Sequence, residues 1–409
     1  TLHFFFRRIH VTGSRRLPEH IPVILIANHS ASFLDAMLIA VKTRRPVYFY
    51  ARGDVFNNRF AARILGMLHM MPLYSPEHGR ENMGRNRDSF ADGERILRRN
   101  GLLLIFPEGF SRLERVIMPL KKGTARIALQ TEASVEFKAG LEVVPLGINY
   151  SEHGFRADVM LCYGESTRVD AYAELHADEP AKAVNRLTTE LERKFIPTVL
   201  AVKQPERSEL LGMLLRMMRD DTLAGRNYNT SQYERERWLC EAVSSWPDDV
   251  AERYISDCEA YQQLLRRHGL QDRVLADVIP GRWPSNLLLV LGAPVALAGA
   301  LICYVPVRFA KWMADRMVTR EDFYTSVASG VGGFGSFVWC CLLLLTAWIF
   351  GNTWLCLVVL ISPLLAFVAI HWWEGWRSLI AQRRWAKLKK ENPAMAAHLS
   401  ALRVRLKVW

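Results

Sequence analysis

Two short motifs carry side chains suited to acid–base chemistry and to anion binding. The first spans residues 28–35 and contains His29 with a carboxylate, Asp35, six positions later. The second spans residues 106–112, and its members that bear on chemistry are Glu108, Gly109, Ser111 and Arg112. Each motif follows an apolar run, and the loops that follow the strands of an α/β sheet are where its active sites lie. The chain therefore offers both a base and an anion site.

The first motif supports two interpretations. A helix beginning at Ser32 would place Asp35 one turn in, where its carboxylate can approach the His29 ring. An imidazole oriented in this way can take a proton from a substrate hydroxyl. Residues 32–35 also fit a capping box, in which Asp35 bonds back to the start of the helix. The sequence leaves both roles open.

Basic residues near the second motif favour a phosphate site. Lys121 and Lys122 precede Gly123 at a predicted helix start, so a phosphate could meet both cationic side chains and helix N–H groups. Arg52 follows another predicted strand and can join them. The alternative is a turn and a solvated loop at 108–112, with Lys121 simply exposed to water.

Apolar runs alternate with helical patterns in the first half of the chain. Strands are predicted at 21–27, 46–51, 101–106 and 142–146, and helices at 33–42, 59–68 and 122–130. Strands that alternate with helices form βαβ crossovers. We therefore expect an α/β unit over residues 1–204, with a mostly parallel sheet flanked by helices.

The second half predicts a C-terminal α-helical membrane region at 284–373. No Asp, Glu, Lys or Arg occurs in 285–307 or in 323–373, and the longer stretch can hold a hairpin of two spans at 331–350 and 354–373. The shorter stretch is interrupted by Gly292-Ala293-Pro294. A re-entrant or in-plane broken helix is therefore favoured there over a full span.

Two flanking segments complete the domain organisation. Residues 205–283 are charged and predict a helical connector, with a cover over the site as the alternative. Residues 374–409 form a basic juxtamembrane tail, in which 375–409 hold nine Lys or Arg and a single acid, Glu391. The net charge of +12 is concentrated there, which favours a cytoplasmic segment facing lipid, and with it a catalytic domain facing the cytoplasm. Nucleic-acid binding is not expected, because the chain shows no recognised motif for it.

The order of these segments resembles the four-block pattern of glycerolipid acyltransferases of the PlsC type. The blocks are NHxxxxxD, a basic residue after a strand, FPEG, and a strand ending in residues 143–147. The wider string over 106–129 resembles the subgroup of glycerol-3-phosphate and dihydroxyacetone-phosphate acyltransferases. The resemblance covers about residues 10–200.

The resemblance implies roles for single residues. His29 is implied as the base and Asp35 as its orienting partner, while Glu108 and Gly109 are implied to hold the acyl acceptor. The further substrate-binding residues that we expect are Arg52 at the basic position of the second block, Ser111, Arg112 and Lys122. Pro145 belongs to the fourth block.

The sequence departs from the family pattern at three places. Five residues separate His29 from Asp35 where four are commoner, and Arg112 stands where the subgroup often has His. Ser75 stands where many members carry a phosphate-binding Arg, which leaves Arg80 or Arg85 to compensate.

These observations predict an integral membrane O-acyltransferase of the bacterial inner membrane or the endoplasmic reticulum. A fatty acyl group would pass from an acyl thioester, as acyl-CoA or acyl carrier protein, to glycerol 3-phosphate, with no cofactor or metal. Lysophosphatidate is the alternative acceptor, and a catalytically degenerate scaffold that binds phospholipid is the alternative from another class. A channel is disfavoured because the spans carry no acidic or basic side chain of the kind that marks ion paths.

Overall fold

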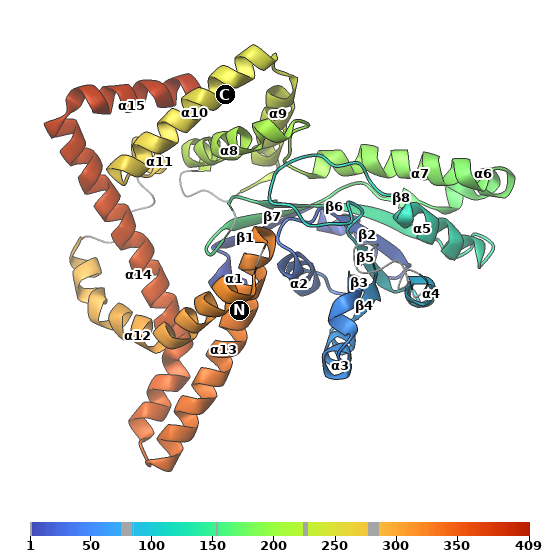
Figure 1. The fold of residues 1–409 in the computed structure, drawn as a ribbon, viewed down its shortest axis with the longest axis horizontal. Coiled ribbons are helices and arrows are strands. Elements are labelled where there is room, and N and C mark those ends of the chain that lie inside the picture. The colour runs from blue at the N-terminus through green and yellow to red at the C-terminus, as the bar shows by residue number, and fades with distance from the viewer. Residues whose placement is uncertain are drawn as a thin grey trace.

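A mostly parallel sheet forms the centre of the N-terminal half of the chain, up to about residue 204, which is called the front domain below (Figure 1). The computed structural model describes residues 2–74, 84, 86–152, 154–223, 228–276, 286–318 and 320–409. Within them the sheet has the strand order β1-β7-β6-β2-β5-β3-β4, with β8 paired to β6. The strands are β1 Arg8–Thr12, β2 Val23–Ala27, β3 Val47–Arg52, β4 Met70–Leu73, β5 Leu102–Ile105, β6 Glu142–Tyr150, β7 Asp158–Tyr163 and β8 Thr167–Arg168. The α/β fold class predicted from the sequence is thereby confirmed.

Pairing in the sheet is parallel except where β6 meets β7 and β8. The four predicted strands correspond to β2, β3, β5 and β6. Strands β1, β4, β7 and β8 were not predicted. Strands β1 and β4 lie at the edges of the sheet and β8 has two residues, so their periodicity is weak. Strand β7 has six residues and lies between β1 and β6, and sequence reasoning missed it.

Helices cover both faces of the sheet, because β2 is apolar on both sides. Val23, Leu25 and Ala27 pack with α1 Leu2–Phe5 and α2 Phe33–Lys42. Ile24 and Ile26 point the other way. On that face lie α4 Asn86–Leu97, α5 Gly123–Ala133 and α7 Pro180–Phe195, which α6 Ala173–Asp178 precedes. The helix α3 Arg59–Met67 connects β3 to β4.

A helical layer with its own core follows the sheet. It comprises α8 Ser208–Leu223, α9 Thr230–Ser245, α10 Asp248–His268, α11 Asp272–Leu275 and the distant α15 Pro393–Leu406. Arg403 of α15 is buried and pairs with Asp221 at 2.8 Å and Asp272 at 2.9 Å. The interpretation of the whole basic tail as a lipid-facing segment is therefore corrected, because α15 packs on protein and its charges pair with acids.

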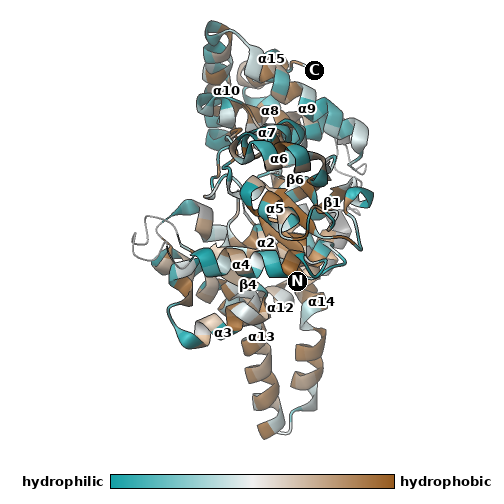
Figure 2. Cartoon of the chain, turned by 90° about the vertical axis from the view of Figure 1, so that its right-hand side faces the viewer, coloured by the Kyte–Doolittle hydropathy of each residue, from teal (hydrophilic) through white to brown (hydrophobic). Residues whose placement is uncertain are grey.

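Three helices are long and apolar enough to cross a membrane: α12 Asn286–Met317, α13 Glu321–Ile349 and α14 Thr353–Glu391. Figure 2 shows the apolar α13–α14 hairpin projecting from the rest of the chain. The expected break near residues 292–294 is replaced by a continuous α12 that contains Pro294 and Pro306. Figure 1 shows α12 as a curved helix, as proline within a helix predicts.

Neighbouring helices support the bend in α12. Pro306 has no N–H to donate to the carbonyl of Ile302, four residues earlier. The indole N–H of Trp339 in α13 donates to that carbonyl instead, at 3.1 Å. At Gly299 the backbone of α14 passes so close that a Cβ would lie 2.3 Å from the Leu365 carbonyl oxygen. The helix thus remains continuous because a side chain replaces the missing backbone donor.

Candidate active site

The two motifs meet at the carboxyl ends of β2 and β5, which are adjacent in the sheet. His29 follows β2, and its Nδ1 lies 3.0 Å from Oδ2 of Asp35. The His29 ring also stacks on Phe106, with 3.9 Å between ring centroids. Because a carboxylate only accepts hydrogen bonds, Nδ1 is assigned as the donor. Nε2 is then left as a proton acceptor, and the His29 side chain is 19% exposed.

Asp35 is completely buried and accepts hydrogen bonds from four donors. Besides His29, the backbone N–H groups of Ser30 and Ala31 donate to Oδ2 at 2.9 and 2.8 Å. The hydroxyl of Tyr150 donates to Oδ1 at 2.6 Å. Burial and the neighbouring carboxylate raise the pKa of Tyr150 well above its usual range, so its hydroxyl keeps its proton. Asp35 lies against His29 and also binds the N–H groups of Ser30 and Ala31 before α2. The capping box over residues 32–35 is not formed, because the Ser32 side chain makes no capping hydrogen bond.

The loop that carries His29 is fixed from two sides. The amide of Asn28 extends the pairing of β2 with β6, since it donates to the Ile148 carbonyl at 2.9 Å and accepts from the Ile148 N–H at 2.7 Å. Ser326 of α13 accepts from the Leu34 N–H at 3.2 Å and donates to the Ala31 carbonyl. A helix of the membrane region therefore contacts the histidine loop directly.

The second motif bonds to the first through its backbone. The N–H of Arg112 donates to the His29 carbonyl at 2.9 Å. Gly109 adopts φ +83°, and a Cβ there would lie 2.2 Å from Nζ of Lys121. The ring of Phe110 lies 5.1 Å from the Arg112 guanidinium and 5.7 Å from Nζ of Lys121. These distances suit cation–π contacts, so two cations gather on one aromatic ring beside the histidine loop.

Glu108 is buried behind the histidine loop. Its carboxylate accepts from the backbone N–H of His29, which lowers its pKa, but burial dominates and raises the pKa to about 7. Asp35 raises the pKa further, and Arg112 lowers it. Glu108 is thus a carboxyl group that titrates near neutral pH.

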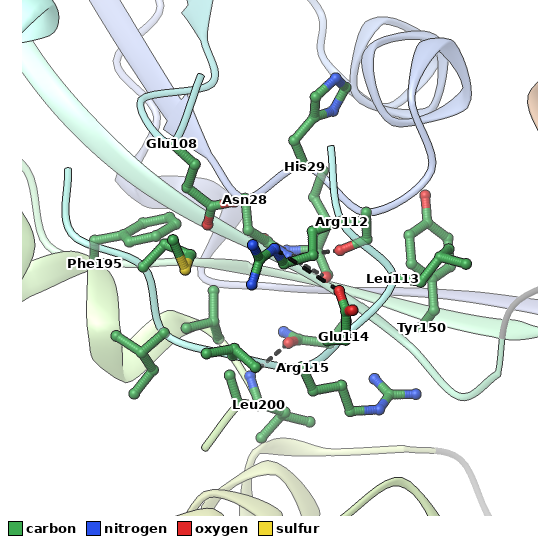
Figure 3. A pocket seen from close by; sticks show the side chains of 18 residues that line it. Asn28, His29, Glu108, Arg112, Leu113, Glu114, Arg115, Tyr150, Phe195 and Leu200 are labelled. Atoms are coloured by element: carbon green, nitrogen blue, oxygen red, sulfur yellow. Dashed lines mark hydrogen bonds and ion pairs between the residues drawn. The ribbon is translucent and has the colours of Figure 1, made fainter. Parts of the chain in front are cut away.

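A pocket lies beside these residues (Figure 3), and its lining includes Glu108, Arg112, Phe195 and Leu200. Figure 3 shows the side chains of Glu108 and Arg112 reaching into it, whereas the His29 ring points away from it. His29 and its neighbours Asn28 and Ser30 are among the lining residues, so the pocket lies directly beside the histidine loop. In the described part of the chain, no cluster of three or more His, Cys, Asp or Glu could hold a metal.

Comparisons with known proteins identify the family. Residues 8–149 match the family model described as Acyltransferase. The front domain is a member of the acyltransferase family. The family predicted from the two motifs is thereby confirmed.

Two relatives with curated sequences match this chain. It is 35% identical to glycerol-3-phosphate O-acyltransferase 2 of Saccharomyces cerevisiae, over 25% of this chain and 14% of that protein. It is 32% identical to an uncharacterized acyltransferase of Schizosaccharomyces pombe, over 42% of this chain and 38% of that protein. The chain therefore matches less than half of the length of either relative.

One solved structure is also similar. It is the 1-acyl-sn-glycerophosphate acyltransferase PlsC of Thermotoga maritima, with 20% sequence identity and a TM-score of 0.31. The match covers 47% of this chain and 75% of that chain.

The other predicted site residues occupy different places around the His29–Asp35 pair. Arg52 ends β3, on the far side of β5 from β2, and forms two hydrogen bonds with Asp54, at 3.1 and 2.7 Å. Ser111 is buried in the second motif, and its carbonyl accepts from Arg320 at 3.3 Å. Lys122 is exposed at the start of α5. Ser75, Arg80 and Arg85 lie outside the described residues.

Sequence reasoning missed three residues that contact the His29–Asp35 pair or its loop. Tyr150 ends a strand that was predicted to stop at 146, and no local pattern connects it to Asp35. Phe106 is the first residue of the second motif, but its stacking on His29 was not expected. Ser326 lies within an apolar stretch, where a single hydroxyl gives no signal.

Proposed function

We propose that this chain is a membrane-associated O-acyltransferase that transfers a fatty acyl group from a thioester to a hydroxyl of glycerol 3-phosphate. The observation that carries the proposal is the hydrogen-bonded series Tyr150, Asp35 and His29, which leaves Nε2 as the proton acceptor. In the described part of the chain, no protein group bonds to Nε2. The family match and the name of the yeast relative, a glycerol-3-phosphate O-acyltransferase, support this reaction class.

The proposed chemistry needs a single base. Nε2 of His29 takes the proton of the acceptor hydroxyl as its oxygen attacks the thioester carbonyl. The tetrahedral intermediate then expels the thiolate, which recovers the proton from the imidazolium. Asp35 stabilises the imidazolium while it exists, because its carboxylate lies on the Nδ1 side. No covalent acyl-enzyme is required, since the thioester of acyl-CoA or acyl carrier protein is already activated.

Acceptor binding is assigned to the cations near the second motif. The Arg112 guanidinium and the Lys121 ammonium converge on Phe110, in a loop whose backbone bonds to His29. A phosphate ester gains charge-assisted hydrogen bonds from such groups. Buried Glu108 supports the histidine loop from behind, so its proposed role is to hold the loop that meets the acceptor.

The two adjacent lysines provide a matched comparison. Lys121→Ala should raise the KM for the acceptor by about tenfold, the effect of one lost charge-assisted contact. Lys122→Ala should change it much less, because both lysines are exposed but, in the described part of the chain, only Lys121 of the two lies over the Phe110 ring. Steady-state kinetics with both substrates varied distinguishes the two, and an equal rise in the donor KM would contradict acceptor binding.

The decisive experiment is a parallel assay of the purified chain in lipid. Labelled acyl-CoA is offered with glycerol 3-phosphate, dihydroxyacetone phosphate or lysophosphatidate, and acyl carrier protein is tested as a second carrier. We expect glycerol 3-phosphate to be acylated, and His29→Ala to lower turnover by ~10²-fold or more. Preference for lysophosphatidate would overturn the acceptor assignment, and failure with every acceptor would favour a phospholipid-binding scaffold.

A further inference from the structure

An apolar stripe on α3 has no partner within the described part of the chain. Phe60, Ile64 and Met67 lie on one side of the helix, and Leu68 continues the stripe just beyond its end. Phe60 is 75% exposed and Met67 is 67% exposed, and the other two are also exposed. The protein-facing side of α3 is different: Leu65 packs against the core between the sheet and α2. The helix α3 is thus apolar on the side where Leu65 packs on the protein and also on the exposed side that carries Phe60 and Met67.

The position of α3 indicates what covers the stripe. In Figures 1 and 2, α3 lies toward the end of the molecule from which the α13–α14 hairpin projects. The N-terminal part of α13 packs against α2 through Ser326, on the same face of the sheet as Leu65. A bilayer that holds the hairpin therefore reaches the neighbourhood of α3.

The charges on α3 fit the same surface. Arg59 and Arg63 are exposed and lie one helical turn apart. At 100° per residue they fall beside the apolar stripe, on the opposite flank from Leu65. A helix with an apolar face and adjacent arginines is suited to the boundary between lipid headgroups and acyl chains, where the guanidinium groups reach the phosphates.

We propose that α3 is a second membrane contact, lying in the interface with Phe60, Ile64, Met67 and Leu68 in the lipid. This contact is separate from the three long helices and does not depend on the proposed reaction. It holds the β3–β4 edge of the sheet against the same membrane that the hairpin enters. The partner is bilayer lipid, with anionic headgroups preferred.

The test uses an environment-sensitive fluorophore at single cysteines in a cysteine-depleted full chain. Met67→Cys reports on α3, and Val404→Cys is the control, because Val404 is equally exposed at 68% but lies on α15. The chain is reconstituted as single copies in nanodiscs of phosphatidylcholine and phosphatidylglycerol. We expect lipids with nitroxide-labelled acyl chains to quench the Met67→Cys label several-fold more than the Val404→Cys label.

Other outcomes overturn the proposal. Equal and weak quenching at both positions would show that α3 faces water. If the Met67→Cys label is shielded only when two copies share a disc, the stripe contacts a second copy instead. Arg59→Glu with Arg63→Glu should remove any dependence of the quenching on phosphatidylglycerol, and an unchanged dependence would show that these arginines do not bind headgroups.

Discussion

At the residue scale, Asp35 connects groups from distant parts of the chain. The sequence predicted its partnership with His29, because a strand-to-helix loop brings positions six apart together. It could not predict Tyr150, which lies 115 positions away and arrives through the parallel pairing of β2 with β6. Contacts set by sheet order leave no local pattern in the sequence, whereas contacts within one loop do.

Removing the Tyr150 hydroxyl tests whether Tyr150 positions Asp35. Tyr150→Phe should lower kcat by about tenfold, because one donor is lost from a buried carboxylate that holds His29. The acceptor KM should stay unchanged, and the protein should stay folded, because the ring remains. Tyr163→Phe is the matched control, since Tyr163 is buried in the same core cluster without contacting Asp35. Equal losses in both variants would indicate general damage to the core.

The titration of Glu108 predicts a pH-dependent stability. Its pKa of about 7 in the folded chain exceeds the ordinary 4.5. The folded state is therefore penalised when the group ionises, and stability falls as pH rises from about 4.5 to 7. Glu108→Gln removes the charge, so its melting temperature relative to wild type should rise between about pH 5 and pH 8. The limiting difference is on the order of 3 kcal/mol.

Melting curves of the detergent-solubilised protein measure this difference. Glu114→Gln is the control, because Glu114 lies in the same loop with a side chain that is 55% exposed. A Glu108→Gln variant whose relative stability does not change with pH would show that Glu108 titrates normally.

At the scale of elements, α13 contacts the candidate active site and is also one of the three long apolar helices. Ser326 bonds to the Ala31 carbonyl and the Leu34 N–H, on either side of Ser32. Ser32 adopts φ +50°, a conformation unfavourable for residues other than glycine, so the loop depends on such contacts. The membrane helix thereby contributes to the position of His29.

Substitution of Ser326 tests this coupling. Ser326→Ala should lower kcat by about tenfold with little change in either KM, since small displacements of a base are costly. Ser326→Thr should restore much of the activity, because it keeps the hydroxyl. Ser329→Ala is the control on the same helix, since in the described part of the chain the Ser329 hydroxyl bonds only to the Ser326 carbonyl, at 3.0 Å. Failure of the threonine variant to rescue would argue against a positioning hydroxyl.

The membrane helices also show what pattern reading can and cannot predict. Apolar length correctly located α12, α13 and α14. The expected break in α12 came from Gly292 and Pro294, which weaken a helix considered alone. The hydrogen bond that the Trp339 indole donates to the Ile302 carbonyl could not be predicted, because it depends on how α13 crosses α12.

At the scale of the whole molecule, contacts place both ends of α12 on the side of the front domain. Near its start, the Leu289 carbonyl accepts from the Trp372 indole at 2.6 Å. Two residues further along α14, Glu374 pairs with Arg156 of the front domain at 2.7 Å. After its end, Arg320 donates to Ser111. A helix that starts and ends on one side does not cross the bilayer, so we expect the curved α12 to stay in one leaflet while the hairpin enters and returns.

This arrangement predicts the topology of the chain. Single cysteines are placed in a cysteine-depleted variant at Ser14, Glu321 and Ser400, and at Asn352 in the hairpin turn, all of which are exposed. With the basic segments on the cytoplasmic side, the first three should resist an impermeant thiol reagent applied to intact cells and should react once the membrane is opened.

The result at Asn352 depends on the depth of the hairpin. If α13 and α14 span the bilayer, Asn352→Cys is labelled from outside, and this is the expected result. Labelling of Ser14→Cys alone among the other three would mean that α12 crosses the membrane after all. Such a result would contradict the contacts of Arg320 and Glu374 with the front domain, because those contacts require residues 320, 374 and the histidine loop to share one side. Outside labelling of Ser14, Glu321 and Ser400 together would instead invert the whole molecule and separate the active site from cytosolic acyl donors.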